Sequence, residues 1–166
     1  MENELKKRKP NRLHDFDYGT NGAYFITICK QDKKCILGNT VGVGVPDDPQ
    51  IKLSEYGKIV YNQIIEMNKI YNNVNVEKFI VMPNHLHLLI EITNNGSSGT
   101  PTPTNSVVPS FVSTLKRFTN KKIGKQLWQR SYYDHIIRNE EDYLNVWEYI
   151  NNNPAKWTED KYYNNN

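Results

Sequence analysis

Cysteine is scarce in this sequence, with two in 166 residues. Cys29 and Cys35 lack the spacing of a CxxC motif and lie in or beside an apolar run, so we expect partly buried, reduced thiols and a cytoplasmic protein. No window approaches the ~18 consecutive apolar residues that a membrane-spanning helix needs. The N-terminus is charged and has no apolar segment typical of a signal peptide. We therefore expect neither secretion nor a membrane partner.

A large excess of one charge is also absent. The net charge of +3 and the pI near 8.7 permit a nucleic-acid partner without requiring one. The basic residues gather in two clusters, which can be ordinary solvated faces or a phosphate-binding track. The predicted DNA-binding residues are Lys6, Lys7, Arg8, Lys9, Lys116, Arg117, Lys121, Lys122 and Arg130.

Histidine is rare too, but two of the four lie close together. His85 and His87 fall in an alternating segment, where a period of two places both on one face and Leu86 and Leu88 on the other. Side chains two residues apart on a strand are about 7 Å apart, so both rings can reach one metal ion at about 2.1 Å. The alternative is a pair of half-buried histidines that only pack on a sheet.

Hydrophobic periodicity predicts elements in the order β, α, β, β, α, β, α, which is typical of an α+β antiparallel sheet with helices packed on one face. We expect the strands over 74–82 and 85–92 to pair as a hairpin. The segments 42–49 and 93–105 are rich in turn-forming residues and are predicted loops. The length fits one domain, here 23–157, with a basic N-terminal tail over 1–22 and a polar C-terminal tail over 158–166. The other predicted strands cover 23–29 and 127–137, and the predicted helices cover 55–70, 107 to near 124, and 140 to the residue before Pro154.

The last predicted helix carries two polar residues beside its apolar stripe. Tyr149 lies about 110° from the centre of that stripe, and Asn153 lies one turn further on the same side. Both can be simple edge residues of a helix that faces the core. The stripe itself consists of Tyr143, Val146, Trp147 and Ile150.

Four segments together resemble the REP-associated tyrosine transposases, the single-tyrosine, IS200-like branch of the HUH endonuclease superfamily. The resemblance implies a ferredoxin-like or RRM-like fold with the histidine pair on a central strand. It implies a metal-dependent single-stranded DNA endonuclease and strand transferase that acts through a 5′-phosphotyrosine intermediate on hairpin-bearing DNA. The four segments are NGAYFITIC, VMPNHLHLLI, LWQRSYYDHIIR and EYINNNPAKW.

Residue by residue, the resemblance implies His85 and His87 as metal ligands, Asn153 as a third ligand and Tyr149 as the nucleophile. The donor types suit Mg²⁺ or Mn²⁺. Because Tyr149 and Asn153 stand at i and i+4, one helical face can present both. No catalytic step is assigned to three further matching residues, Trp128, Arg130 and His135.

The expected partner is single-stranded or hairpin DNA, and the chain is expected to be a monomer or homodimer. One alternative is a non-catalytic RRM-like domain that binds single strands and only packs its histidines. Another is a small metal-dependent hydrolase with water as nucleophile, which needs ligands beyond the remaining His14 and His135. The histidine pair combined with Tyr149 and Asn153 favours the endonuclease, because binding alone requires none of them.

Overall fold

Two strands at the centre of the sheet carry apolar side chains on both faces. They are β1 (Gly22–Cys29) and β5 (His85–Ile92), which pair antiparallel. The strand order is β4-β5-β1-β6, with β4 (Val74–Val81) and β6 (Tyr133–Ile136) at the edges. The computed structural model describes residues 21–42, 49–93 and 107–164. Because neighbouring residues of a strand point to opposite faces, both faces of β1 and β5 need covering.

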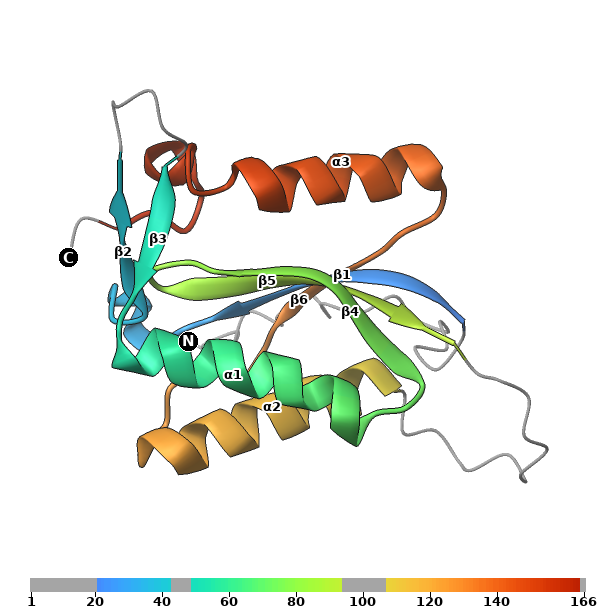
Figure 1. Ribbon diagram of the computed structural model, residues 1–166, viewed down its shortest axis with the longest axis horizontal. Coiled ribbons are helices and arrows are strands. Elements are labelled where there is room, and N and C mark those ends of the chain that lie inside the picture. The colour runs from blue at the N-terminus through green and yellow to red at the C-terminus, as the bar shows by residue number, and fades with distance from the viewer. Residues whose placement is uncertain (1–20, 43–48, 94–106, 165–166) are drawn as a thin grey trace, which may run out of the picture.

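Helices α1 (Glu55–Ile70) and α2 (Val107–Ile123) lie side by side on one face of the sheet (Figure 1). α1 begins after Ser54, whose side-chain oxygen accepts a hydrogen bond from the backbone N–H of Gly57, as expected of an N-cap. The apolar stripes of the two helices meet the inward residues of β1 and β5 in the larger core. The chain order β1, α1, β4, β5, α2, β6 with this strand order is ferredoxin-like, as the sequence predicted.

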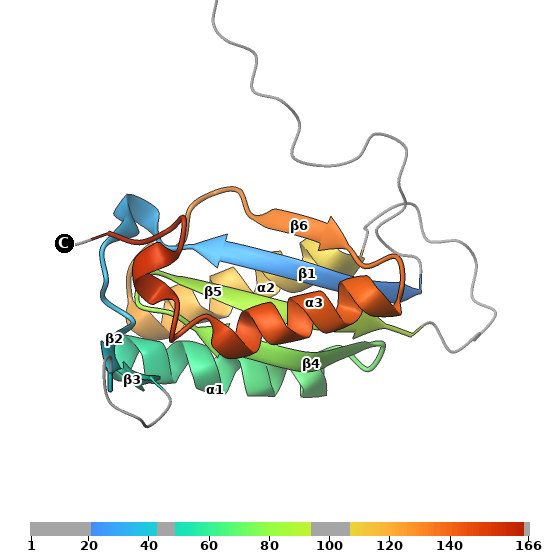
Figure 2. The same cartoon turned by 90° about the horizontal axis from the view of Figure 1, so that it is seen from above.

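Helix α3 (Glu140–Asn152) crosses the opposite face of the sheet (Figures 1 and 2). Its residues Val146 and Ile150 pack against Phe25 and Leu89 in a second, smaller core. The expectation that the helices share one face is therefore wrong for α3. Phe25 and Leu89 point away from α1 and α2, so an apolar surface would stay exposed to water without a helix on this side.

The remaining elements agree with the predicted pattern. β4 and β5 form the expected hairpin, and β2 (Gly38–Val41) pairs with β3 (Gln50–Leu53) in a separate two-stranded sheet. Within the described ranges no helix combines the length and the apolar composition needed to cross a membrane. The predicted tail over 1–20 and most of the two predicted loops lie outside the described residues.

Candidate active site

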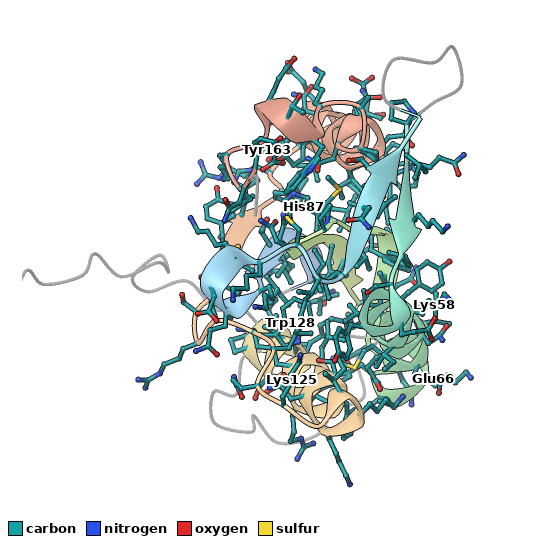
Figure 3. All side chains as sticks on the ribbon, turned by 90° about the vertical axis from the view of Figure 1, so that its left-hand side faces the viewer. Lys58, Glu66, His87, Lys125, Trp128 and Tyr163 are labelled. Atoms are coloured by element: carbon teal, nitrogen blue, oxygen red, sulfur yellow. The ribbon has the colours of Figure 1, made fainter. Side chains whose placement is uncertain are left out.

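The two histidines lie on β5, an inner strand, and point toward α3. Figure 3 shows His87 on the α3 side of the sheet and Trp128 on the other side. Both imidazoles are fully buried. The Nε2 atoms of His85 and His87 are 2.9 Å apart. The alternation read from the sequence therefore brings two ring nitrogens to one point.

The far nitrogen of each imidazole is held by a polar neighbour. Asn84 donates through Nδ2 to two backbone carbonyls, at 2.8 and 3.0 Å, so its Oδ1 is the atom that accepts from Nδ1 of His85, at 2.8 Å. This bond places the proton of His85 on Nδ1 and leaves a lone pair on Nε2. Nδ1 of His87 lies 2.8 Å from the hydroxyl of Thr27, which can donate or accept and so supports either tautomer. Such partners orient histidine ligands at metal sites.

Tyr149 reaches the histidines from α3. The helix begins after Asn139, whose side chain accepts from the N–H of Asp142, and its buried stripe turns Tyr149 to the flank. The Tyr149 hydroxyl lies 3.5 Å from Nε2 of His87, and the side chain is 40% exposed. Tyr149 is thus both next to the histidine pair and open to solvent.

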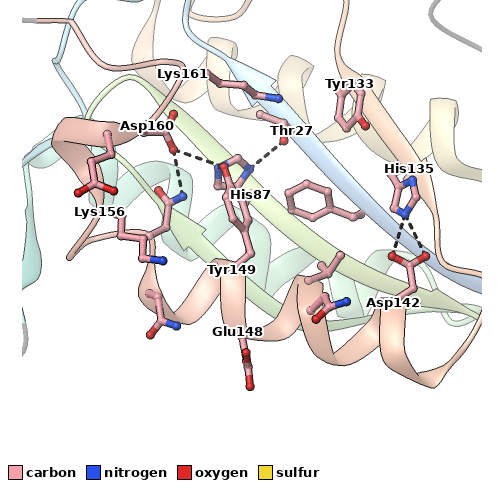
Figure 4. A pocket seen from close by; sticks show the side chains of 16 residues that line it. Thr27, His87, Tyr133, His135, Asp142, Glu148, Tyr149, Lys156, Asp160 and Lys161 are labelled. Carbon is pink, nitrogen blue, oxygen red and sulfur yellow. Dashed lines mark hydrogen bonds and ion pairs between the residues drawn. The ribbon is translucent and has the colours of Figure 1, made fainter.

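Asp160 completes the cluster from the C-terminal segment, after the short 3₁₀-helix η2 (Trp157–Glu159). Its Oδ2 is 4.0 Å from Nε2 of His85 and accepts from Nδ2 of Asn153 at 3.0 Å and from the Tyr149 hydroxyl at 3.4 Å (Figure 4). One ligand atom from each of His85, His87 and Asp160 lies within 4.8 Å of the others. Two nitrogens and a carboxylate oxygen at this spacing can hold a single ion.

The sequence interpretation missed Asp160, because it treated 158–166 as a polar tail. In the structure Trp157 is only 6% exposed, and the Tyr162 ring lies 4.7 Å from the His85 ring. These aromatic side chains anchor the segment on the site, so the boundary predicted at Trp157 falls short of a site residue. The signal in the sequence was three aromatic residues among polar ones, Trp157, Tyr162 and Tyr163.

Asn153 has an unused polar atom at the same place. Its amide nitrogen must face Asp160, because a carboxylate only accepts hydrogen bonds. Its Oδ1 is buried and has no hydrogen-bond partner among the described residues. A buried acceptor without a partner costs about 1–3 kcal/mol, so this oxygen fits the third ligand expected from the sequence.

Comparison with known proteins agrees with this geometry. The sequence model of the family described as "Transposase IS200 like" matches residues 50–153. The chain belongs to this IS200-like transposase family. A Haemophilus influenzae protein of uncharacterised function is 33% identical over 96% of the chain and 94% of that protein. A second protein of that organism, which carries the name REP-associated tyrosine transposase, is 24% identical over 84% of the chain and 74% of its own length.

A solved structure also shares the fold. It is that of a REP-associated tyrosine transposase bound to a REP hairpin, and it matches with a TM-score of 0.62 and 19% identity over 90% of this chain and 74% of that one. The predicted resemblance to this branch of the IS200-like family and the predicted α+β fold are therefore confirmed. The family gives the chain a transposase-like role.

The predicted DNA-binding cations of this IS200-like chain do not gather at the histidines. Arg117, Lys121 and Lys122 belong to α2, on the other face of the sheet (Figure 1). Lys116 donates to three backbone carbonyls at 2.9–3.2 Å, and burial lowers the pKa of its ammonium group to about 8. Arg130 is exposed, and Lys6–Lys9 lie outside the described residues.

Two residues of the recurrent family segment now have structural partners. Trp128 is buried and donates through Nε1 to the Thr119 hydroxyl on α2 at 2.7 Å, so it fixes α2 to the sheet. His135 on β6 contacts both carboxylate oxygens of Asp142 on α3 through Nε2, at 2.9 and 3.0 Å. This pair ties the edge strand to the first turn of the helix that carries Tyr149.

Burial sets the protonation of the site. It lowers the pKa of His85 to about 4, although the charge of Asp160 opposes the shift, and it lowers the pKa of His87 well below its ordinary 6.5. Both imidazoles are therefore neutral at pH 7, as ligands must be. Burial, followed by the charge of Asp160, raises the pKa of Tyr149 to about 12, while a hydrogen bond from Asn153 opposes this.

This arrangement predicts a loss of stability in mild acid. The unfolded His85, with a pKa near 6.5, binds a proton that the folded residue refuses until about pH 4, so the free energy of unfolding falls as pH falls from 7 to 5. His85 alone contributes on the order of 2 kcal/mol of this loss. Urea unfolding in EDTA at both pH values measures it. His85→Gln should lose less stability than the wild type over this range, and an equal loss would contradict buried, neutral histidines.

Proposed function

We propose that this chain is a metal-dependent endonuclease and strand transferase for single-stranded DNA, with Tyr149 as the nucleophile. One observation carries the proposal: the Tyr149 hydroxyl lies 3.5 Å from Nε2 of His87, beside the His85, His87 and Asp160 cluster. Membership of the IS200-like transposase family supports the same chemistry. A binding domain has no need of a solvent-open tyrosine at a buried cluster of ligand atoms.

The residues present fit a divalent cation. His85 and His87 would supply nitrogens, Asp160 and Asn153 would supply oxygens, and this mixed set suits Mn²⁺ or Mg²⁺. A cation bound there would neutralise the charge that develops on the scissile phosphate and favour the phenolate of Tyr149. Without such help the phenol is a weak nucleophile, because an unperturbed tyrosine is only ~0.1% ionised at pH 7 and this site raises the pKa further.

The side chains then divide the work. The Tyr149 oxygen attacks the phosphorus, a new O–P bond forms, and the bond from phosphorus to the 3′-oxygen breaks. The products are a 5′-phosphotyrosine and a strand with a free 3′-hydroxyl, whose oxygen takes up the proton that the phenol gave up. Oδ2 of Asp160, 3.4 Å from the hydroxyl, can accept that proton in passing. Attack of another 3′-hydroxyl on the phosphotyrosine reverses the step and joins strands.

Two lysines that the sequence interpretation did not select line the cavity of the site. Lys156 and Lys161 both border it, and the Lys161 ammonium lies 5.0 Å from the centre of the Tyr133 ring. We propose that they attract the phosphates of the strand that enters the site. The α2 cations and the Lys6–Lys9 segment remain a proposed second footprint for a DNA hairpin, as the hairpin bound by the solved relative suggests.

A pool of hairpin oligonucleotides with randomised single-stranded flanks tests the function without knowledge of the target. With Mn²⁺, we expect a covalent protein–DNA adduct on a denaturing gel, and sequencing of the linked strands gives the target. EDTA should abolish the adduct, and a blunt duplex pool should give none. Binding should weaken steeply with salt. No adduct under any metal condition, or equal yield in EDTA, would reject the proposal.

Asp160 gives a sharper test of the ligand set. Asp160→Asn should weaken Mn²⁺ binding by about 10- to 100-fold, as loss of a site carboxylate does. In metal-free protein the same change should lower the pKa of Tyr149 from about 12 toward its ordinary value, because a nearby negative charge is removed. Titration of Mn²⁺ by electron paramagnetic resonance and an NMR titration of the Tyr149 ring carbon measure the two effects. Glu159→Gln, which changes the charge of an exposed neighbour, is the matched control.

A further inference from the structure

The cavity of the candidate active site is much larger than a metal ion needs. Its volume is about 700 Å³, and it extends from His87, Tyr149 and Asp160 to Tyr133 and His135 on the edge strand β6. Cavities of this size hold whole organic ligands. Figure 4 shows Tyr133 and His135 on one side of the cavity and Tyr149 on the other.

Strand register arranges the sheet side of the cavity in two rows. The first row is His87, Thr27 and Tyr133, which pair across β5, β1 and β6. The second row begins about 7 Å along the strands and contains Phe25 paired with His135. The cavity therefore reaches from the histidine cluster across β1 to the open edge of the sheet.

Helix α3 supplies the facing wall. Asn145 stands one turn before Tyr149, about 6 Å along the helix axis, and lines the same cavity. A group held between Asn145 and the second row is thus next to whatever Tyr149 attacks.

The wall chemistry fits an unpaired nucleobase. The Phe25 ring stacks on His87, with centroids 5.2 Å apart, and meets Tyr149 edge-on at 5.8 Å. Tyr133 is 46% exposed, although it is aromatic and lies on a wall of the cavity. Aromatic faces stack on bases, and amide and imidazole groups bond to base edges. His135 is already oriented, because its Nε2 donates to Asp142 and its Nδ1 then remains an acceptor when the ring is neutral.

We propose that Phe25, Tyr133, His135 and Asn145 form a subsite that binds one unpaired base of the DNA strand, next to the scissile phosphate. The proposal rests on the endonuclease function proposed above and adds how the substrate strand is held and read. The base stacks on the aromatic wall, and its edge faces His135 and Asn145. Stacking in this subsite also places the phosphate in line with Tyr149.

An abasic scan tests the subsite. The oligonucleotide recovered from the adduct is made in versions with one abasic site at each unpaired position, and affinity and Mn²⁺-dependent cleavage are measured. For the wild type, one position near the cut should cost ~10-fold in affinity. Tyr133→Ala should cost as much on the intact strand and be insensitive to the abasic site at that position, whereas Tyr133→Phe should resemble the wild type. The matched control is Tyr61→Ala, since Tyr61 is 45% exposed and lies on α1 away from this cavity.

A second measurement needs no variant. The fluorescent base 2-aminopurine, placed at the sensitive position, should be quenched when the wild-type protein binds, because it stacks on aromatic rings. If all abasic strands bind and react like the intact one, or if the effects of Tyr133→Ala and the abasic site simply add at every position, the subsite is wrong while the endonuclease stands. If no strand forms an adduct, the endonuclease is wrong, and a scan by affinity alone decides the subsite.

Discussion

Tyr149→Phe should eliminate the covalent protein–DNA adduct and reduce strand cleavage by at least about 10³-fold, with little change in fold or DNA binding. The substitution removes one oxygen and keeps the ring. That ring meets Phe25 edge-on at 5.8 Å and His87 at 5.2 Å, and both contacts survive in the variant. The lost contacts are long ones, at 3.4 and 3.5 Å, so the free energy of unfolding should change by less than about 1 kcal/mol.

The control variants are other tyrosines of the site. Tyr143→Phe should leave activity unchanged, because the Tyr143 ring packs against Trp147 on the buried stripe. Tyr162→Phe is the stricter control, since its ring lies 4.7 Å from the His85 ring. Mass spectrometry of the peptide linked to DNA identifies the attacking residue. An adduct that maps to Tyr162, or that persists in Tyr149→Phe, would overturn the assignment.

Cleavage without any adduct would favour the hydrolase alternative. That mechanism required a further ligand beyond the histidine pair, and Asp160 is a carboxylate in the required place. The decisive difference is chemical: water as nucleophile leaves a free 5′-phosphate, whereas Tyr149 leaves a 5′-phosphotyrosine. The position of the Tyr149 hydroxyl, 3.5 Å from His87, favours the tyrosine.

Much of the site follows from short-range periodicity. A period of two puts His85 and His87 on one face of a strand, and a period of 3.6 puts Tyr149 and Asn153 on the flank of a helix. These relations hold whatever surrounds the element, and the structure contains both. Helix limits were predictable for the same reason, since Ser54 and Asn139 cap the helices that follow them.

The parts that could not be predicted depend on packing between distant segments. Whether α3 covers the same face as α1 is decided by Phe25 and Leu89, whose strands are apolar on both faces and give no sign of which helix goes where. Asp160 joins His85 across 75 residues of sequence, through a segment with no regular period. Lys116 looked like a surface cation on a helix, but the chain at 129–131 folds over its ammonium group.

Substitutions at His87 should separate metal binding from packing more cleanly than truncation to alanine, which leaves a hole in a fully buried place. An asparagine amide can occupy the position of Nδ1, and a glutamine amide the position of Nε2. His87→Asn keeps a partner for the Thr27 hydroxyl, now 2.8 Å from Nδ1, but loses the nitrogen that faces His85 and Tyr149. His87→Gln keeps a polar atom on that inner side and loses the bond to Thr27.

We expect His87→Asn to bind Mn²⁺ at least about 100-fold more weakly than the wild type and to lose cleavage, while its melting temperature in EDTA stays close to that of His87→Gln. His87→Gln should retain measurable Mn²⁺ binding, because an amide oxygen can replace the lost nitrogen as a ligand. Mn²⁺ titration by electron paramagnetic resonance, thermal melts in EDTA and the adduct assay give the three readouts. If the histidines only pack, both variants should bind Mn²⁺ like the wild type and lose activity in proportion to lost stability. Weaker binding in His87→Gln than in His87→Asn would place the metal on the wrong side of the ring, because Nε2, not Nδ1, is the atom that the structure turns toward Tyr149.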